Sequence, residues 1–289
     1  MLITRFQDPL KFRDHVQEFL LQHEAENNMI FNILGGIISK RYTGDNLMVS
    51  VEEQGDIVLV AIMTPPKNIV LSFTQKLKSI DELVKYLVRN EIFIPGVLGF
   101  KKGSKKFATL WSKSKKITFK LAMNEKIYKL EDLNEQVLGT REFIKADLTH
   151  ESIILNWTKL FIEEALPQEI SDFNEDYMQV IKNRIKNGRY FILLDRNKPV
   201  SMVHKAGKTP NGNLINAVYT PTHLRRNGYA TEVVANISKL LLAEGNKFCF
   251  LFTDLSNPTS NKIYQDVGYR PIIDMDQYKF ILDEEGIKN

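Results

Sequence analysis

The stretch VYTPTHLRRNGYA, residues 218–230, decides the fold of this 289-residue chain. An apolar run ends at Tyr219 in turn residues, and beyond Ala230 apolar residues recur at helical spacing. The first turn of a helix leaves backbone N–H groups unpaired and carries the positive end of the helix dipole. Because Gly228 has no Cβ, a ligand can approach the backbone of this turn closely. We therefore predict an anion site where a strand passes into a helix.

This turn and the segment that follows it resemble the GNAT superfamily of acyl-CoA-dependent N-acyltransferases. The pattern Arg225-x-x-Gly228-x-Ala230 is similar to the Arg/Gln-x-x-Gly-x-Gly/Ala loop of that superfamily. The next segment contains a buried strand, an Asn at a helix start, a Tyr within that helix and a closing Gly-Tyr, in the order that the superfamily has: residues 248–253, Asn257, Tyr264 and Gly268-Tyr269. The resemblance covers about residues 142–282.

The resemblance implies a mixed α/β (α+β) fold, in which helices flank a central and mostly antiparallel sheet. The length of the chain allows two domains. The N-terminal half repeats the same order of expected elements but lacks the residues of the anion turn. Its counterpart of the anion turn, FTQKLKS at residues 73–79, contains no glycine. We expect two tandem copies: residues 1–135 as a degenerate GNAT-like domain and residues 136–289 as the acyl-CoA-binding catalytic domain. An unrelated α/β domain in the first half is the alternative.

Periodicity and turn residues also predict particular elements around these motifs. Thr149 is expected to cap a helix over residues 151–166. The other expectations are a helix at 174–187, a hairpin of strands 190–194 and 200–206, two strands at 117–123 and 126–130 near the boundary, and a last strand at 278–282.

The coenzyme site follows from the resemblance. It implies that pantetheine pairs with the backbone at residues 218–220 and that pyrophosphate sits on the N–H groups of residues 226–231. The residues expected to bind acetyl-CoA are Val218, Tyr219, Thr220, Arg225, Arg226, Asn227, Gly228, Tyr229, Ala230, Thr231, Asn257, Ser260 and Tyr264.

The resemblance also implies catalytic roles. The backbone N–H near Tyr219 would polarise the thioester carbonyl, and Tyr264 would act as general acid on the departing thiolate. Packing of Tyr264 as an ordinary buried aromatic is the alternative. Asn257, which precedes Pro258, is suited to capping a helix, to binding pantetheine, or to both.

No general base is evident in the sequence. Residues 214–218 offer only Asn216 as a polar side chain, whereas some GNAT enzymes carry a Glu there. Carboxylates around the two early helices are candidates for holding a cationic amine or relaying its proton, and each is also explained as a surface residue: Glu163, Glu164, Asp172, Glu175 and Asp176. His204 and His223 are candidates for titration near neutrality, but neither has an identifiable partner in the sequence.

Composition and charge limit which partners, metals and cellular locations we expect for this chain. The net charge of +4 with no arginine-rich or RNA-stacking motif argues against nucleic acid as a partner. Residues 101–120 contain eight lysines and no acid, which we interpret as a solvated helix face. Cys249 lies between two Phe residues and is expected to be a buried thiol. The chain has no metal-ligand spacing, signal peptide or long apolar run, so we expect a cytoplasmic protein that needs no metal and no membrane.

The function that the resemblance implies is transfer of acetyl from acetyl-CoA to a primary amine of a small molecule or protein, by direct attack of the amine. One alternative is transfer of another acyl or aminoacyl group on the same fold. Another is a non-catalytic acyl-CoA-binding regulatory module. A homodimer is compatible with the sequence, which does not identify the acceptor.

Overall fold

The computed structural model describes residues 1–254 and 258–281 and divides the chain into two compact units. Unit 1 contains Met1–Ile127 together with the chain from Ile272 onward, and unit 2 contains Tyr128–Pro271. The same order of elements, βααβββαβαβ, occurs twice along the sequence. The two tandem copies expected from the sequence are therefore present as repeated secondary structure.

The first copy supplies most of unit 1. Its elements are β1 (Leu2–Arg5), α1 (Pro9–Leu21), α2 (Asn28–Ile38), β2 (Leu47–Glu53), β3 (Asp56–Met63), β4 (Ile69–Leu71), α3 (Lys78–Arg89), β5 (Gly96–Phe100), α4 (Lys101–Lys115) and β6 (Thr118–Leu130). The second copy runs through β7 (Glu142–Lys145), α5 (Glu151–Ala165), α6 (Glu175–Lys186), β8 (Tyr190–Asp195), β9 (Lys198–Lys208), β10 (Gly212–Tyr219), α7 (Tyr229–Ala243), β11 (Phe248–Asp254), α8 (Pro258–Val267) and β12 (Arg270–Ile281).

The sheets of the two units have matching strand orders. They are β1-β2-β3-β4-β5-β12 in unit 1 and β7-β8-β9-β10-β11-β6 in unit 2. Most neighbours are antiparallel, but β4 is parallel to β5 and β10 is parallel to β11. This mixed, mostly antiparallel sheet confirms the predicted fold class.

The last strand differs from the sequence-based expectation. β12 begins at Arg270 instead of residue 278, and its Tyr278 lies opposite Val97 of β5. A division at 135/136 assigns residues 275–279 to the second domain, whereas their pairing with β5 brings them into unit 1. Likewise β6 is one continuous strand where two short strands at 117–123 and 126–130 were expected.

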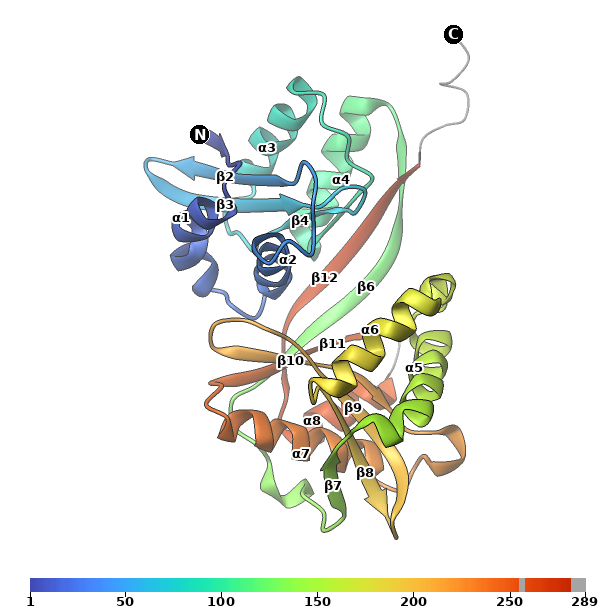
Figure 1. Ribbon diagram of the computed structural model, residues 1–289. Helices are drawn as coiled ribbons and strands as arrows, with labels where there is room; N and C mark the ends of the chain where they lie inside the picture. The colour runs from blue at the N-terminus through green and yellow to red at the C-terminus, as the bar shows by residue number, and fades with distance from the viewer. Residues whose placement is uncertain (255–257, 282–289) are drawn as a thin grey trace. The chain divides into compact units, whose positions relative to one another are not determined.

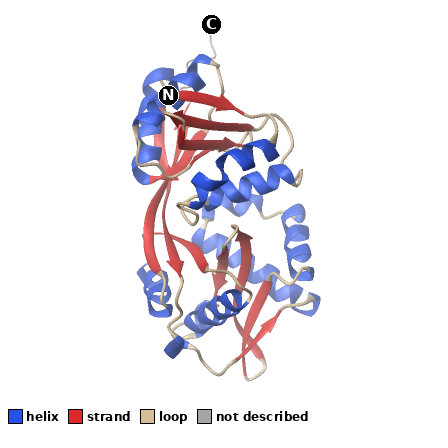
Figure 2. Ribbon diagram, turned by 90° about the vertical axis from the view of Figure 1, so that its left-hand side faces the viewer, coloured by secondary structure: helices blue, strands red, loops and turns tan. Residues whose placement is uncertain are grey.

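In each unit the helices cover both faces of the sheet (Figures 1 and 2). In unit 2, Trp157 of α5 and Ile181 of α6 join one buried cluster, and Val233 of α7 and Val267 of α8 join another. In unit 1, Phe12 of α1 and residues of α2 pack on β2 and β3. Each fully buried aliphatic side chain contributes roughly 1.5–3 kcal/mol, so these clusters hold the helices on the sheets.

The start of α5 corrects the expected cap. A short turn, Leu148–His150, precedes the helix, and the Asp147 carboxylate accepts a hydrogen bond from the Thr149 N–H at 2.9 Å. Asp147 and His150 complete a capping box there. Asp147 therefore caps this turn, and Thr149 donates to the cap instead of being the cap.

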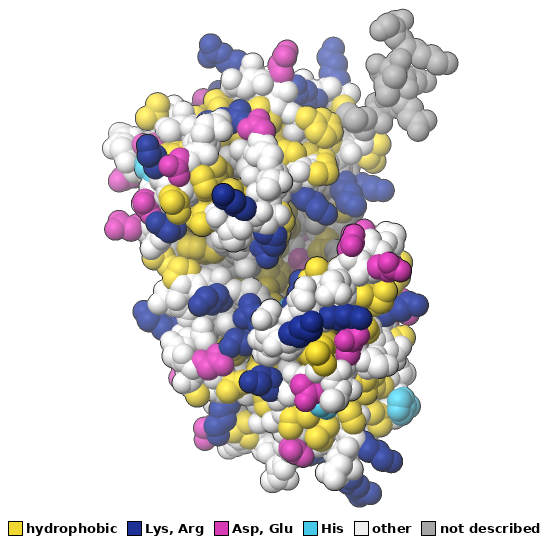
Figure 3. Space-filling view, viewed as in Figure 1, with side chains coloured by type: hydrophobic (Ala, Val, Ile, Leu, Met, Phe, Trp, Pro, Cys, Tyr) yellow, Lys and Arg dark blue, Asp and Glu magenta, His cyan; other side chains and the backbone are white. Residues whose placement is uncertain are grey.

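Charges are interspersed on the surface. On the face in Figure 3, basic side chains lie among acidic and uncharged ones. Within the lysine-rich segment, Lys106 pairs with Asp81, and the Lys105 ammonium lies 4.7 Å from the centre of the Phe119 ring. Among the described helices, none is long and apolar enough to span a membrane.

Candidate functional site

The two parallel strands of unit 2 separate toward their carboxyl ends. Their described pairing covers only Gly212–Leu214 against Phe248–Phe250, although β10 continues to Tyr219 and β11 to Asp254. In β10 the register against β9 shifts between Asn216 and Tyr219, and Ala217 has a φ of 46°. Such a bulge bends a strand and interrupts its pairing. This bulge lies in the part of β10 that has no described pairing with β11.

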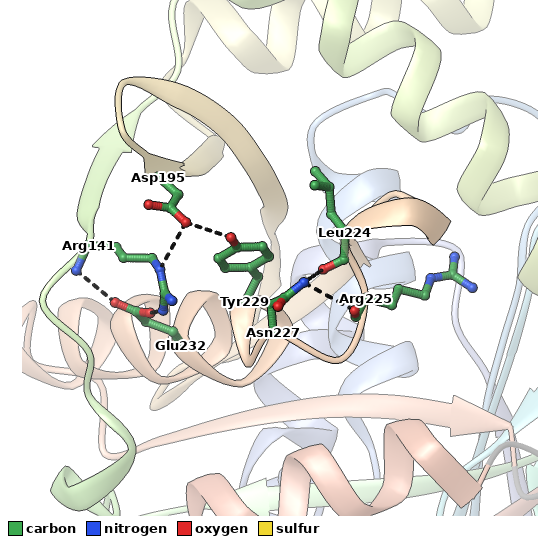
Figure 4. Close-up of polar contacts among 7 residues, drawn as sticks. All are labelled: Arg141, Asp195, Leu224, Arg225, Asn227, Tyr229 and Glu232. Atoms are coloured by element: carbon green, nitrogen blue, oxygen red, sulfur yellow. Dashed lines mark hydrogen bonds and ion pairs between the residues drawn. The ribbon is translucent and has the colours of Figure 1, made fainter.

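The turn itself is built from left-handed residues. Arg226 has a φ of 68° and Gly228 a φ of 78°. The Asn227 amide donates to the carbonyl oxygens of Leu224 and Arg225, at 3.1 and 3.3 Å (Figure 4). A Cβ at Gly228 would have no heavy atom of the described residues within 4 Å. Asn227 thus stabilises the turn, and the space over Gly228 is open.

The backbone N–H groups of this turn are free of protein partners within the described part of the chain. The first helical hydrogen bond of α7 is donated by the Glu232 N–H to the Gly228 carbonyl, at 3.0 Å. Among the residues that the structure describes, no acceptor lies on the N–H groups of residues 226–231. Consecutive free N–H groups in a turn of this kind form a concave site for an anion.

A buried carboxylate braces the first turn of α7 (Figure 4). Glu232 is 3% exposed, and it accepts hydrogen bonds from the Arg141 N–H at 2.9 Å and from the Arg141 guanidinium. This hydrogen bond to Glu232 raises the pKa of Arg141 and keeps it charged. The Tyr229 hydroxyl donates to Asp195 at 2.6 Å, beneath the same guanidinium. Arg141 therefore neutralises a negative charge that would otherwise lie beside the anion turn.

Position 139 must be glycine for Glu232 to occupy its place beside Arg141. A Cβ there would lie 2.1–2.4 Å from the carboxylate atoms of Glu232. No local pattern in the sequence signals the contact between Arg141 and Glu232, because these residues are 91 positions apart. Tyr229, expected among the coenzyme-binding residues, uses its side chain here and has only its backbone free.

A second polar group joins α5 to the end of β10. The Tyr219 hydroxyl donates to Glu164 Oε1 at 3.3 Å, and its ring packs against Trp157. Arg225 donates from Nη2 to Glu164 Oε2 at 2.6 Å and from Nε to the Thr220 carbonyl at 3.0 Å. Burial, followed by the nearby Glu164 charge, raises the pKa of Tyr219. This group brings together residues that the sequence nominated separately.

The end of β10 is also tied to β9. The buried Ser201 hydroxyl donates to the Tyr219 carbonyl at 3.0 Å and lies 2.9 Å from the Thr220 hydroxyl. The Tyr219 carbonyl thus accepts from Ser201, and the Thr220 carbonyl accepts from Arg225 Nε, so both already have partners within the protein. A carbonyl oxygen has two lone pairs, so further hydrogen bonds to them are compatible with this arrangement.

Tyr264 lies on α8, beyond the open end of β11. It packs on the same core cluster as Val218, with its ring 6.3 Å from that of Tyr128 and 6.1 Å from that of Tyr269. Burial raises the pKa of Tyr264 to about 12, so its hydroxyl is protonated at neutral pH. Ser260 belongs to α8, and Asn257 lies outside the described residues.

The other candidate carboxylates lie on the surface. Glu163 is 3.8 Å from Lys159, and Asp172, Glu175 and Asp176 are exposed. Of the nominated acids, Glu164 is the one whose contacts within the described structure reach β10.

His204 does not titrate near neutrality as expected. Its ring is buried and stacks on Tyr190 at 4.7 Å, and burial lowers its pKa to about 3. His204 is therefore a neutral core residue. Cys249 is fully buried, as expected, and burial raises the pKa of its thiol to about 12. The thiol is therefore uncharged at neutral pH.

An open cavity of about 840 Å³ lies elsewhere in unit 2. It lies among β7, the turn between α6 and β8, and the end of α7, and its lysine at position 205 is paired with Glu244. None of its lining residues belongs to the anion turn, β10 or β11.

In the corresponding loop of unit 1, side chains occupy two of the backbone N–H groups. Phe73 N–H donates to the Asn27 side chain at 2.8 Å, and Lys76 N–H donates to the Thr74 hydroxyl at 2.9 Å. The Phe73 ring packs against those of His23 and Phe100, at 4.4 and 5.4 Å. This loop thus differs from the turn in unit 2, where no described residue accepts from the N–H groups of residues 226–231.

Comparison with known proteins agrees with this architecture. Residues 194–280 match the family model described as FR47-like protein. A GNAT-family acetyltransferase from Colwellia psychrerythraea aligns over 97% of this chain and 100% of its own, at 14% identity and a TM-score of 0.57. A GCN5-related N-acetyltransferase from Sphaerobacter thermophilus aligns over 86% of each chain, at 12% identity and a TM-score of 0.56.

A tandem GNAT protein from the clavulanic acid biosynthesis pathway aligns over 96% of this chain and 97% of its own, at 11% identity and a TM-score of 0.56. No curated protein matches the sequence. The chain has the GNAT fold, as its motifs predicted.

Proposed function

We propose that this GNAT-fold chain is an N-acetyltransferase, which transfers acetyl from acetyl-CoA to a primary amine by direct attack of the amine on the thioester. The observation that supports this most is the run of N–H groups at residues 226–231, unpartnered among the described residues and next to open space over Gly228. These groups suit a pyrophosphate. The separated ends of β10 and β11 suit the pantetheine arm.

The coenzyme-binding residues are proposed as follows. The backbone of Val218, Tyr219 and Thr220 pairs with pantetheine, and the turn from Arg225 to Thr231 binds the phosphates, with Arg225 and Arg226 adding positive charge. Asn257, Ser260 and Tyr264, which follow β11 in the sequence, are proposed to complete the set. No metal is required for this reaction, and among the described residues no group of His, Cys, Asp and Glu side chains is arranged to hold one.

Two groups are proposed to act on the thioester. The Tyr219 N–H polarises the carbonyl as negative charge develops on its oxygen. Tyr264, whose hydroxyl is protonated at neutral pH, donates its proton to the departing thiolate. Holding the amine and the thioester together supplies a further part of the rate.

Glu164 is proposed to hold the acceptor. Its carboxylate lies at the end of α5 within 3.3 Å of the Tyr219 hydroxyl, on the strand whose backbone N–H we assign to the thioester. A half-exposed carboxylate at that position binds a cationic amine, and it relays the proton of that amine through water to solvent, so that the neutral nitrogen attacks the thioester.

Calorimetric titration with acetyl-CoA tests the coenzyme site. We expect binding to the unaltered chain and at least about a tenfold loss of affinity in Gly228→Trp, whose indole fills the open space over the turn. The matched control is Gly245→Trp, because Gly245 also has a positive φ, 92°, and a Cβ there would meet no heavy atom of the described residues within 4 Å. Equal affinities in the two variants would remove the turn from the site.

A further inference from the structure

The guanidinium of Arg225 already has an anionic partner. Its Nη2 lies 2.6 Å from Glu164 Oε2, while its Nε is occupied by the Thr220 carbonyl. The Tyr219 hydroxyl bonds the other oxygen of Glu164 at 3.3 Å. The side chain assigned to the coenzyme's phosphates is thus held by a carboxylate of α5.

A phosphate is suited to replace Glu164 as the partner of Arg225. The side chains of Arg225 and Glu164 are 43% and 44% exposed, and a half-exposed pair of this kind is weak. A phosphate is a strong partner for a guanidinium, because it offers several acceptor oxygens in matching geometry. The Thr220 carbonyl holds Nε, and with it the planar guanidinium, in place, so the exchange needs only the Glu164 side chain to move away from Nη2.

We propose that Glu164 is an internal competitor of the coenzyme: it holds Arg225 until the phosphates of acetyl-CoA take the guanidinium, and the exchange frees the Glu164 carboxylate for the acceptor amine. This inference rests on the proposed function. It follows that the coenzyme binds before the acceptor amine. The Glu164 carboxylate becomes free to bind the amine only after the coenzyme has taken Arg225. Glu163, one residue earlier, takes no part, since its contact is with Lys159.

Titration of CoA into single and double variants tests the competition. Glu164→Gln keeps the shape of the side chain and removes its charge, so Arg225 is released and CoA should bind about two- to fivefold more tightly. Arg225→Gln should weaken CoA about tenfold, because a charge-assisted contact is lost. In the Arg225→Gln background, Glu164→Gln should have no effect.

Two controls separate this exchange from the general repulsion between a carboxylate and a polyanion. Glu163→Gln removes the same charge one residue away and should leave CoA affinity unchanged. Arg226→Gln removes a neighbouring positive charge, and in that background the gain from Glu164→Gln should persist.

The outcomes are distinct. Unchanged or weaker CoA binding in Glu164→Gln overturns the competition, and so does a gain that survives in Arg225→Gln. Absence of CoA binding to the unaltered chain overturns the proposed function itself and this inference with it.

Discussion

At the scale of single residues, the Tyr264 hydroxyl is the sharpest test of the chemistry. Tyr264→Phe removes one oxygen from a ring that packs on Tyr128 and Tyr269, so the fold should persist. If this hydroxyl donates the proton to the thiolate, kcat should fall about 10²- to 10⁴-fold while CoA affinity stays the same. Steady-state kinetics with an amine from a library screen, beside calorimetry, measure both quantities.

Tyr128→Phe is the matched control for that change. Tyr128 belongs to the same core cluster, and its hydroxyl accepts only a long hydrogen bond, 3.5 Å, from Gln265 within the described structure. Its turnover should equal that of the unaltered chain. An equal rate in Tyr264→Phe would instead leave Tyr264 as the packed aromatic of the alternative interpretation.

His204 carries a pH dependence of stability. Its pKa is about 3 in the folded chain and about 6.5 when unfolded, so below pH 6.5 the unfolded state takes up a proton that the folded state does not. Stability from this residue is complete above pH 6.5 and falls by about 1.4 kcal/mol per pH unit below it.

The variant His204→Phe removes this proton uptake and keeps a ring to stack on Tyr190. Between pH 7 and 5 the unaltered chain should lose about 2 kcal/mol more free energy of unfolding than the variant, as urea titrations measure. The exposed His223 serves as the control, and His223→Phe should retain the full slope. Parallel slopes in His204→Phe and the unaltered chain would contradict a buried neutral imidazole.

These residues also show the reach of sequence reasoning. Gly228 and Arg225 were identified because a turn is a local pattern, and its conformation depends on neighbouring residues. The contact of Arg141 with Glu232, and that of Glu164 with Arg225, join residues 91 and 61 positions apart, and no local pattern marks either. The charge state of His204 was predicted wrongly because burial, which determines it, is a property of the packed fold.

At the scale of elements, β12 is the strand whose place was least predictable. Helical periodicity located α6 and α7 well, since the pattern of a helix is contained in its own residues. The partner of a strand, in contrast, is not indicated by the residues of that strand. Nothing in residues 270–281 indicates that they pair with β5, whose residues lie far earlier in the chain.

A proline in β12 tests this pairing. The Phe280 N–H donates to the Pro95 carbonyl at the start of β5, at 3.1 Å, and Phe280→Pro removes this donor and strains the strand. Amide hydrogen exchange should then rise in peptides covering β4 and β5 and stay low in those covering β8 and β9.

Phe280→Tyr, which keeps the donor and a ring to pack on Trp111, should leave exchange unchanged. Exchange that rises equally in all four strands after Phe280→Pro would contradict a specific role of β12 in unit 1.

At the scale of the whole molecule, the fold is built twice, but only one copy has the geometry of an anion site in the part of the chain that the structure describes. In unit 2 the N–H groups of residues 226–231 have no acceptors among the described residues. In unit 1 the counterpart loop bonds two of its N–H groups to the side chains of Asn27 and Thr74 and packs the Phe73 ring against two other rings. We infer that the first copy, covering most of residues 1–135, supplies structure without binding coenzyme.

The stoichiometry of acetyl-CoA binding measures this asymmetry. One molecule should bind per chain, and Gly228→Trp should remove that single binding event without uncovering a second. Lys76→Gln, in the unit 1 loop, should leave both affinity and stoichiometry unchanged, because Lys76 pairs there with Glu53. Two molecules per chain, or a Lys76→Gln variant that binds less, would mean that unit 1 holds coenzyme through side chains. The asymmetry of the backbone would then not determine where coenzyme binds.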